Sequence, residues 1–140
     1  MTVDQKAVEF MDIATKLHSK NFFDIFVDYS QPETRILEAL MKTEDKFLTP
    51  STLSENLRIS RVNVTNALNS LESLGFIERS IDKKDRRKVN VKITKVGKIE
   101  IEKVYGRVIT FLSNMFKMIG EKLTDDFLET VKVIDKQIEN

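Results

Sequence analysis

The sequence predicts a mainly α-helical fold that carries one small β-hairpin. Apolar residues recur at steps of three and four over most of the 140 residues, as in amphipathic helices. The spacing changes to alternation around residues 89–93, as in a strand with one buried face. At this length we expect a single domain with appended helices.

The N-terminal part predicts one long helix. Val3, Ala7 and Phe10 open a helical pattern that extends to Phe26. Residues 28–32 interrupt it, and the proline of that segment suits the first turn of a second helix. Three phenylalanines near the interruption fit either the core, which we favour, or an effector pocket: Phe22, Phe23 and Phe26.

Two short helices follow, each with a start signal. Thr49 offers a hydroxyl to free backbone donors before Pro50, and Ser60 caps the next helix in the same way. Gly75 is expected to end the helix capped by Ser60 in a left-handed conformation. Its inward positions are predicted to be Val64, Leu68, Leu71 and Leu74. The pair predicts a helix-turn-helix.

After Gly75 the sequence predicts a hairpin and then two more helices. Val89, Val91 and Ile93 alternate with polar residues, and residues 76–81 supply the facing strand. A long helix over residues 95–120 and a final helix from near Thr124 complete the chain.

The long helix is apolar on two sides and too long for a small core to cover, so we expect a homodimer. A bundle within a single chain is the alternative. The predicted dimer contacts are Phe10, Leu17, Phe111, Met115, Phe127, Val131 and Ile134.

The net charge of +1 hides an uneven distribution. Residues 1–78 hold 8 Lys or Arg against 12 Asp or Glu, residues 79–98 hold 9 against 2, and residues 99–140 hold 6 against 8. The block charges are −4, +7 and −2. One segment would therefore attract a polyanion.

The second short helix has a polar outer face that suits the base edges of a major groove. Asn can pair with adenine and Arg with guanine, whereas Thr can donate or touch a thymine methyl. An ordinary solvated helix face is the alternative. The predicted DNA-reading residues are Arg61, Asn63, Thr65, Asn66 and Asn69.

The hairpin tip is rich in cations, as in a wing that contacts phosphates and places one Arg in a minor groove. A soluble turn is the alternative, although such turns usually mix charges. Asp85 and Arg87 are two residues apart, so in extended backbone they would share a side and could pair. The predicted wing residues are Lys83, Lys84, Asp85, Arg86, Arg87 and Lys88.

The residue inventory argues against an enzyme. The chain has no cysteine, one histidine (His18) and no glycine-rich phosphate loop, so we expect no catalytic residue, metal or cofactor. The N-terminus lacks the pattern of a signal peptide, and no run approaches 18 apolar residues. We therefore expect a cytoplasmic protein with no membrane contact.

Three short stretches around the hairpin have a specific spacing: Leu74-Gly75-Phe76-Ile77-Glu78-Arg79, then Asp82 with Asp85-Arg86-Arg87, then Val91-Lys92-Ile93-Thr94-Lys95-Val96-Gly97. Together they resemble the signature of the MarR family of winged-helix regulators. The order of a long first helix, reader helix, wing and two dimer helices also agrees. The resemblance implies one domain over residues 1–140, with a winged helix-turn-helix lobe at 30–98 and a helical dimerisation lobe formed by 1–27 and 99–140.

The resemblance also implies a function. The helix that begins at Arg61 would enter the major groove, and Arg86 or Arg87 would enter the minor groove of a pseudo-palindromic operator. The protein would be a bacterial or archaeal repressor on the nucleoid, released by a small aromatic or anionic ligand. Many members have Arg where this chain has Asn66, so its base preference should differ. The alternative is a protein-interaction module whose basic hairpin binds an acidic partner.

Overall fold

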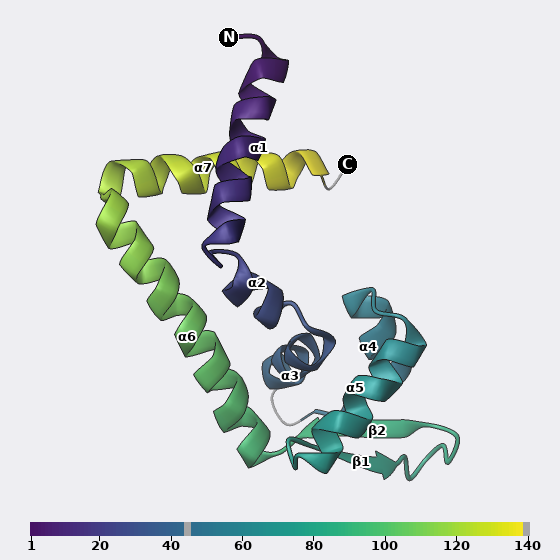
Figure 1. Cartoon of the computed structure of the whole chain (residues 1–140). Coiled ribbons are helices and arrows are strands. Elements are labelled where there is room, and N and C mark those ends of the chain that lie inside the picture. Colours follow the sequence, from purple (N-terminus) through teal and green to yellow (C-terminus); the bar gives the residue numbers. More distant parts are fainter. Residues whose placement is uncertain (44–45, 139–140) are drawn as a thin grey trace. The chain divides into compact units, whose positions relative to one another are not determined.

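A computed structural model describes residues 1–43 and 46–138, and it is helical apart from one hairpin (Figure 1). The elements are α1 (Val3–Ser19), α2 (Asp24–Tyr29), α3 (Pro32–Lys42), α4 (Pro50–Leu57), α5 (Arg61–Ser73), β1 (Ile77–Ile81), β2 (Val89–Ile93), α6 (Lys95–Ile119) and α7 (Glu121–Ile138). The predicted fold class, mainly α-helical with one antiparallel hairpin behind a helix-turn-helix, is confirmed.

The chain forms two compact units, Met1–Tyr105 and Gly106–Asn140. The first unit holds α1 to α5, the hairpin and the start of α6, whereas the second holds the rest of α6 and α7. The predicted lobes, with residues 1–27 joined to 99–140, remain a prediction.

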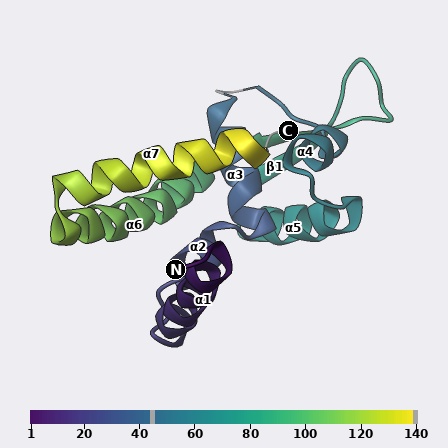
Figure 2. The ribbon, with the colours of Figure 1, turned by 90° about the horizontal axis from the view of Figure 1, so that it is seen from above.

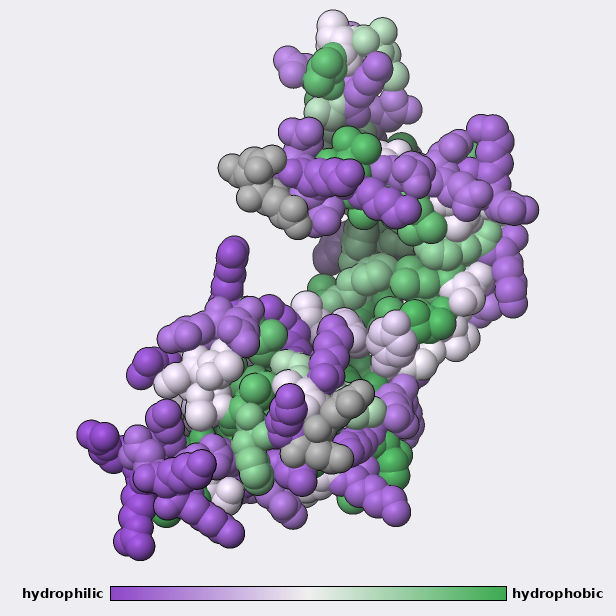
Figure 3. Space-filling view, turned by 180° about the vertical axis from the view of Figure 1, so that it is seen from behind, coloured by the Kyte–Doolittle hydropathy of each residue, from purple (hydrophilic) through white to green (hydrophobic). Residues whose placement is uncertain are grey.

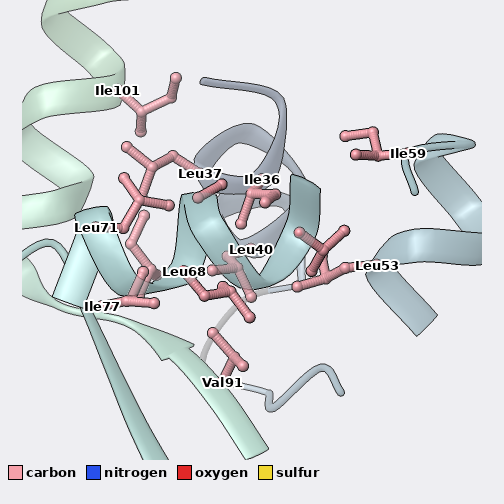
Figure 4. Close-up of a cluster of buried hydrophobic side chains, with 13 residues drawn as sticks. Ile36, Leu37, Leu40, Leu53, Ile59, Leu68, Leu71, Ile77, Val91 and Ile101 are labelled. Atoms are coloured by element: carbon pink, nitrogen blue, oxygen red, sulfur yellow. The ribbon is translucent and has the colours of Figure 1, made fainter. Parts of the chain in front are cut away.

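The core of the first unit is one apolar cluster to which several elements contribute (Figure 4). Ile36 and Val91 are fully buried, and Leu68 on α5 is 1% exposed. The other members are Leu37, Leu40, Leu53, Ile59, Val64, Ala67, Leu71, Ile77, Ile93 and Ile101. Because α3, α4, α5, both strands and α6 share this cluster, burial fixes the helix-turn-helix against the hairpin.

The predicted start and stop signals of α4 and α5 are confirmed. The Thr49 hydroxyl accepts from the Thr52 amide at 3.1 Å, and the Ser60 hydroxyl accepts from the Asn63 amide at 3.1 Å. Gly75 follows α5 with a φ of +77°. Leu74 was expected inward but is 59% exposed, because α5 ends at Ser73 and the chain turns there.

The single N-terminal helix predicted to reach Phe26 is wrong. α1 ends at Ser19, and a turn with Asn21 at a φ of +61° separates it from α2. Asparagine tolerates the left-handed conformation better than most residues, since its short polar side chain bonds locally. The apolar spacing continues through this turn, which is why periodicity concealed the break.

The last helix also begins earlier than predicted. α7 starts at Glu121, directly after Gly120 at a φ of +91°. Thr124 therefore lies within the first turn, where its hydroxyl donates to the Gly120 carbonyl at 2.7 Å. Glycine supplies the left-handed turn at little steric cost, so it sets the boundary.

Helices α1 and α7 bury none of their residues. Of the predicted dimer contacts, Leu17, Phe111 and Met115 are half-buried. The other four are exposed: Phe10 67%, Phe127 49%, Val131 44% and Ile134 51%. Over residues 1–43 and 46–138, no helix combines the length and apolar character needed to cross a membrane.

Candidate nucleic-acid interface

Helix α5 divides into a buried face and a polar exposed face. Val64, Ala67, Leu68 and Leu71 pack into the core. The five predicted reader residues are all exposed: Arg61, Asn63, Thr65, Asn66 and Asn69. The Thr65 hydroxyl donates to the Arg61 carbonyl at 2.9 Å. The helix can therefore present amide, hydroxyl and guanidinium groups to a ligand without losing its core contacts.

The turn between α4 and α5 is held by hydrogen bonds at both ends. Arg58 ends α4 in a left-handed conformation with a φ of +53°. The Ser54 hydroxyl donates to the Ile59 carbonyl at 2.6 Å, and the Arg35 guanidinium donates to the Leu57 carbonyl at 2.6 Å. Because Ile59 is itself buried, the turn fixes the angle at which α5 leaves α4.

The hairpin places its cations in a loop that projects beyond the paired strands (Figure 2). β1 and β2 pair from Ile77 opposite Ile93 to Ile81 opposite Val89, which leaves residues 82–88 as the tip. Hydrophilic side chains crowd the surface of this region, at the lower left of Figure 3. The five wing cations are exposed: Lys83, Lys84, Arg86, Arg87 and Lys88.

Asp82 organises the tip, a role that sequence reasoning missed. Its carboxylate accepts from the Lys84 amide at 2.7 Å, the Asp85 amide at 3.1 Å and the Asn90 side chain at 3.2 Å. The bonds from the Lys84 and Asp85 amides, then from Asn90, lower the pKa of Asp82. An aspartate at the start of a turn was the available signal.

The predicted pairing of Asp85 with Arg87 is confirmed, but its geometric reason is wrong. Arg87 Nε donates to Asp85 Oδ1 at 3.3 Å, and the Arg87 amide donates to the same oxygen at 3.1 Å. The backbone is a turn, closed by Lys88 N to the Asp85 carbonyl at 2.9 Å, and not extended. The Arg87 side chain is 93% exposed, so its terminal nitrogens remain accessible.

Arg79 joins the hairpin to the reader helix, and the sequence did not reveal this contact. From β1 its guanidinium donates to both carboxylate oxygens of Glu72, Nε to Oε2 at 3.2 Å and Nη2 to Oε1 at 2.9 Å. Nη2 also donates to Asn69 Oδ1 at 2.9 Å. The hydrogen bonds lower the pKa of Glu72 and raise that of Arg79.

A second candidate site is a pocket of about 450 Å³ within the first unit. Its lining combines two tyrosines, two carboxylates, one lysine and two apolar side chains: Tyr29, Glu38, Met41, Lys42, Ile101, Glu102 and Tyr105. The two tyrosine rings lie 6.4 Å apart between centroids. Phe22, Phe23 and Phe26 do not line it. The ring centroid of Phe22 lies 5.2 Å from that of Phe23 and 6.3 Å from that of Phe26.

Glu38 is the electrostatic centre of this pocket. It accepts a hydrogen bond from the Tyr29 hydroxyl and another from Lys42 Nζ at 2.9 Å. These two bonds lower the pKa of Glu38, with that from Tyr29 contributing most. Burial, followed by the hydrogen bond to Glu38, raises the pKa of Tyr29. In the part of the chain that the structure describes, no group of three His, Asp or Glu side chains could hold a metal ion.

Comparison with known proteins agrees with this architecture. A family model described as "MarR family" matches residues 27–88. The HTH-type transcriptional regulator PrsX of Escherichia coli is 31% identical over 104 residues, which are 74% of this chain and 60% of PrsX. The chain therefore spans about three fifths of the length of this curated relative.

Solved structures extend the likeness of fold to almost the whole chain. A mutant of MepR from S. aureus has a TM-score of 0.72 at 17% identity, over 99% of each chain. FabT from Streptococcus pneumoniae, in a crystal structure with DNA, has a TM-score of 0.66 at 19% identity, over 93% of this chain and 97% of FabT. The helix-turn-helix and hairpin thus belong to a recurrent fold.

Proposed function

This chain belongs to the MarR family, and on that premise we propose that it binds double-stranded DNA and regulates transcription. Family membership also makes it a regulator and not an enzyme. PrsX is named a transcriptional regulator, and FabT was crystallised with DNA. We place the protein in the cytoplasm, on the nucleoid of a bacterium or archaeon, as a repressor that acts as a homodimer.

One observation carries the proposal: a polar helix face and a cationic loop belong to the same compact unit. α5 exposes its reader residues while its other face is locked in the core, and Arg79 ties the helix to the hairpin. The exposed cations of the tip suit phosphate oxygens, which position a protein on a duplex, whereas the α5 side chains suit base edges.

Within the wing, we assign the minor-groove contact to Arg87. Asp85 holds Arg87 by Nε and by its backbone amide, and no equivalent bond to Arg86 is present among the described residues. A tethered, exposed guanidinium loses less freedom on entering a narrow groove than an untethered one. Lys83, Lys84 and Lys88 then contact phosphates.

The test is a selection of bound fragments from the host genome, followed by affinity measurements over a range of salt concentrations. We expect a pseudo-palindrome with half-sites about 10 base pairs apart. Each phosphate contact should steepen the slope of log affinity against log salt by about 0.9. Lys84→Gln should reduce the slope by about that amount per protomer.

Lys132→Gln is the matched control, since it removes the same charge from an exposed lysine on α7. Its slope should equal that of the wild type. Absence of enrichment at low salt would exclude the proposal. Binding to an acidic protein with no affinity for duplex DNA would favour the interaction module instead.

We further propose that an effector occupies the pocket around Glu38. Tyr29 and Tyr105 suit an aromatic ring, whereas Glu38 and Glu102 oppose an anion and the single lysine is already bonded to Glu38. The lining therefore favours an aromatic ligand with a positive group. An effector releases DNA only if it prefers the state in which the reader helices misfit the operator.

Benzylamine and benzoate provide a matched pair of probes, since both carry one aromatic ring but have opposite charges. We expect benzylamine to raise the melting temperature and weaken operator binding, with benzoate less effective. Glu38→Gln together with Glu102→Gln should remove the difference. Stronger binding of benzoate to the wild type would reverse the proposed preference.

A further inference from the structure

We propose that Arg79 orients the side-chain amide of Asn69 so that Asn69 presents only hydrogen-bond donors to DNA. The expected paired contact between this asparagine and adenine is then not available. This inference rests on the proposed DNA-binding function, but it concerns a single position of the reader helix. It also identifies Arg79 on β1 as a residue that controls specificity without touching DNA.

The chemistry of arginine fixes which end of the amide faces the hairpin. A guanidinium has five donors and no acceptor, so its partner atom on Asn69 must be the carbonyl oxygen. Arg79 Nη2 donates to that oxygen at 2.9 Å. The NH₂ group, on the other side of the amide carbon, is therefore directed away from Arg79.

The guanidinium is itself held in place. Glu72, one helical turn after Asn69, accepts two hydrogen bonds from it at 2.9 and 3.2 Å. The Arg79 side chain is only 27% exposed, whereas Asn69 is exposed. A planar fork bonded at three points has little freedom to rotate, so the amide orientation persists when a ligand approaches.

A fixed amide of this kind restricts what Asn69 can recognise. Reading adenine needs both ends of the amide, an acceptor for the N6 group and a donor for N7. With Oδ1 directed at Arg79, Asn69 offers NH₂ to acceptors such as guanine O6 and N7, thymine O4 or a phosphate oxygen. Among the described residues, no side chain donates a hydrogen bond to the amide oxygen of Asn63 or Asn66, so these two asparagines can still pair with adenine.

The experiment selects operators from a random duplex library with the full-length wild type and with Asn69→Ala. If the acceptor is a base, the variant should lose a guanine or thymine preference of roughly tenfold per half-site. If the acceptor is a phosphate, its affinity should fall equally for all sequences, with a similar base preference. Loss of an adenine preference, or no change at all, would overturn the proposal.

Asn69→Asp sharpens the test, because aspartate keeps the contact with Arg79 but has no donor. It should bind at least as weakly as Asn69→Ala, and wild-type affinity would contradict the inference. Asn66→Ala is the matched control on the same exposed face and should alter a different operator position. Failure of the wild type to bind any duplex would instead refute the proposed function.

The hydrogen bond from Arg79 to Asn69 can also be tested without DNA. In a ¹H–¹⁵N NMR spectrum of the wild type, Arg79→Leu should shift the side-chain amide signals of Asn69, while those of Asn66 remain in place. Circular dichroism verifies that the variant is folded. Unchanged Asn69 signals in a folded Arg79→Leu variant would show that Arg79 does not orient the Asn69 amide, whatever the DNA results show.

Discussion

The hydrogen bond between Tyr29 and Glu38 makes the stability of the first unit depend on pH. The pKa of Glu38 is lowered, so its contribution to stability is present above its ordinary pKa of 4.5 and is lost as the pH falls. The pKa of Tyr29 is raised, so its contribution is present below its ordinary pKa of 10.0 and is lost as the pH rises. The pair therefore stabilises most between these two values.

Tyr29→Phe should remove most of this stabilisation. We expect its free energy of unfolding to fall below that of the wild type by a constant amount from about pH 6 to pH 9, and the difference to shrink below about pH 4.5. Urea unfolding of both proteins at a series of pH values measures this difference in free energy. Tyr105 lines the same pocket, so Tyr105→Phe serves as the control. Its free energy of unfolding should differ from that of the wild type by an amount that stays the same as the pH falls. A Tyr29→Phe difference that persisted at pH 3 would show that Glu38 is not its source.

At the scale of elements, Gly97 permits the close approach of α6 to the hairpin. A Cβ at this position would overlap the Phe76 carbonyl oxygen and lie 2.8 Å from Ile93 Cγ1. Since the obstructing atoms include backbone, the start of α6 would have to shift. Gly97→Ala should destabilise the protein by about 1–3 kcal/mol, as for other overpacked sites.

Gly106→Ala is the natural control on the same helix. A Cβ there meets nothing within 4 Å, and alanine favours a helix over glycine by about 1 kcal/mol. Urea unfolding should therefore show opposite effects, a lower midpoint for Gly97→Ala and an equal or higher one for Gly106→Ala. Equal midpoints for the two variants would mean that the contact around Gly97 relaxes without cost.

The same elements show what the sequence could predict. The caps at Thr49, Ser60 and Gly75 depend on residues three or four positions away, so local patterns identified them. The break at Asn21 was missed because apolar spacing reports which residues are buried and not where the backbone turns. The bond from Arg79 to Asn69 joins a strand to a helix ten residues earlier, and such long-range side-chain contacts have no local signature.

At the scale of the whole molecule, charged and apolar surfaces belong to different parts of the chain. Cations concentrate in residues 79–98, whereas α7 carries exposed apolar side chains along its length. Hydrophobic surface also appears over α6, in green in Figure 3. Apolar surface of this extent usually marks an interaction site, and a second copy of the chain is the proposed partner.

Ile134→Glu tests the proposed homodimer, because it places a charge among Phe127, Val131 and Ile138 on the apolar side of α7. We expect light scattering to give the mass of a monomer where the wild type gives that of a dimer. Operator affinity should fall by about 100-fold or more, since two linked reader helices gain from effective concentration and a single one does not. Helical content should remain, because Ile134 is already 51% exposed within the chain.

Lys132→Glu introduces the same charge on the polar side of α7, where Lys132 pairs with Glu129 at 3.2 Å. An exposed pair of this kind contributes about 0–1 kcal/mol, so this variant should remain dimeric and bind the operator. If Ile134→Glu stayed dimeric while binding DNA normally, the apolar side of α7 would not form the interface. If both variants dissociated, the effect would come from added negative charge and not from the loss of an apolar contact.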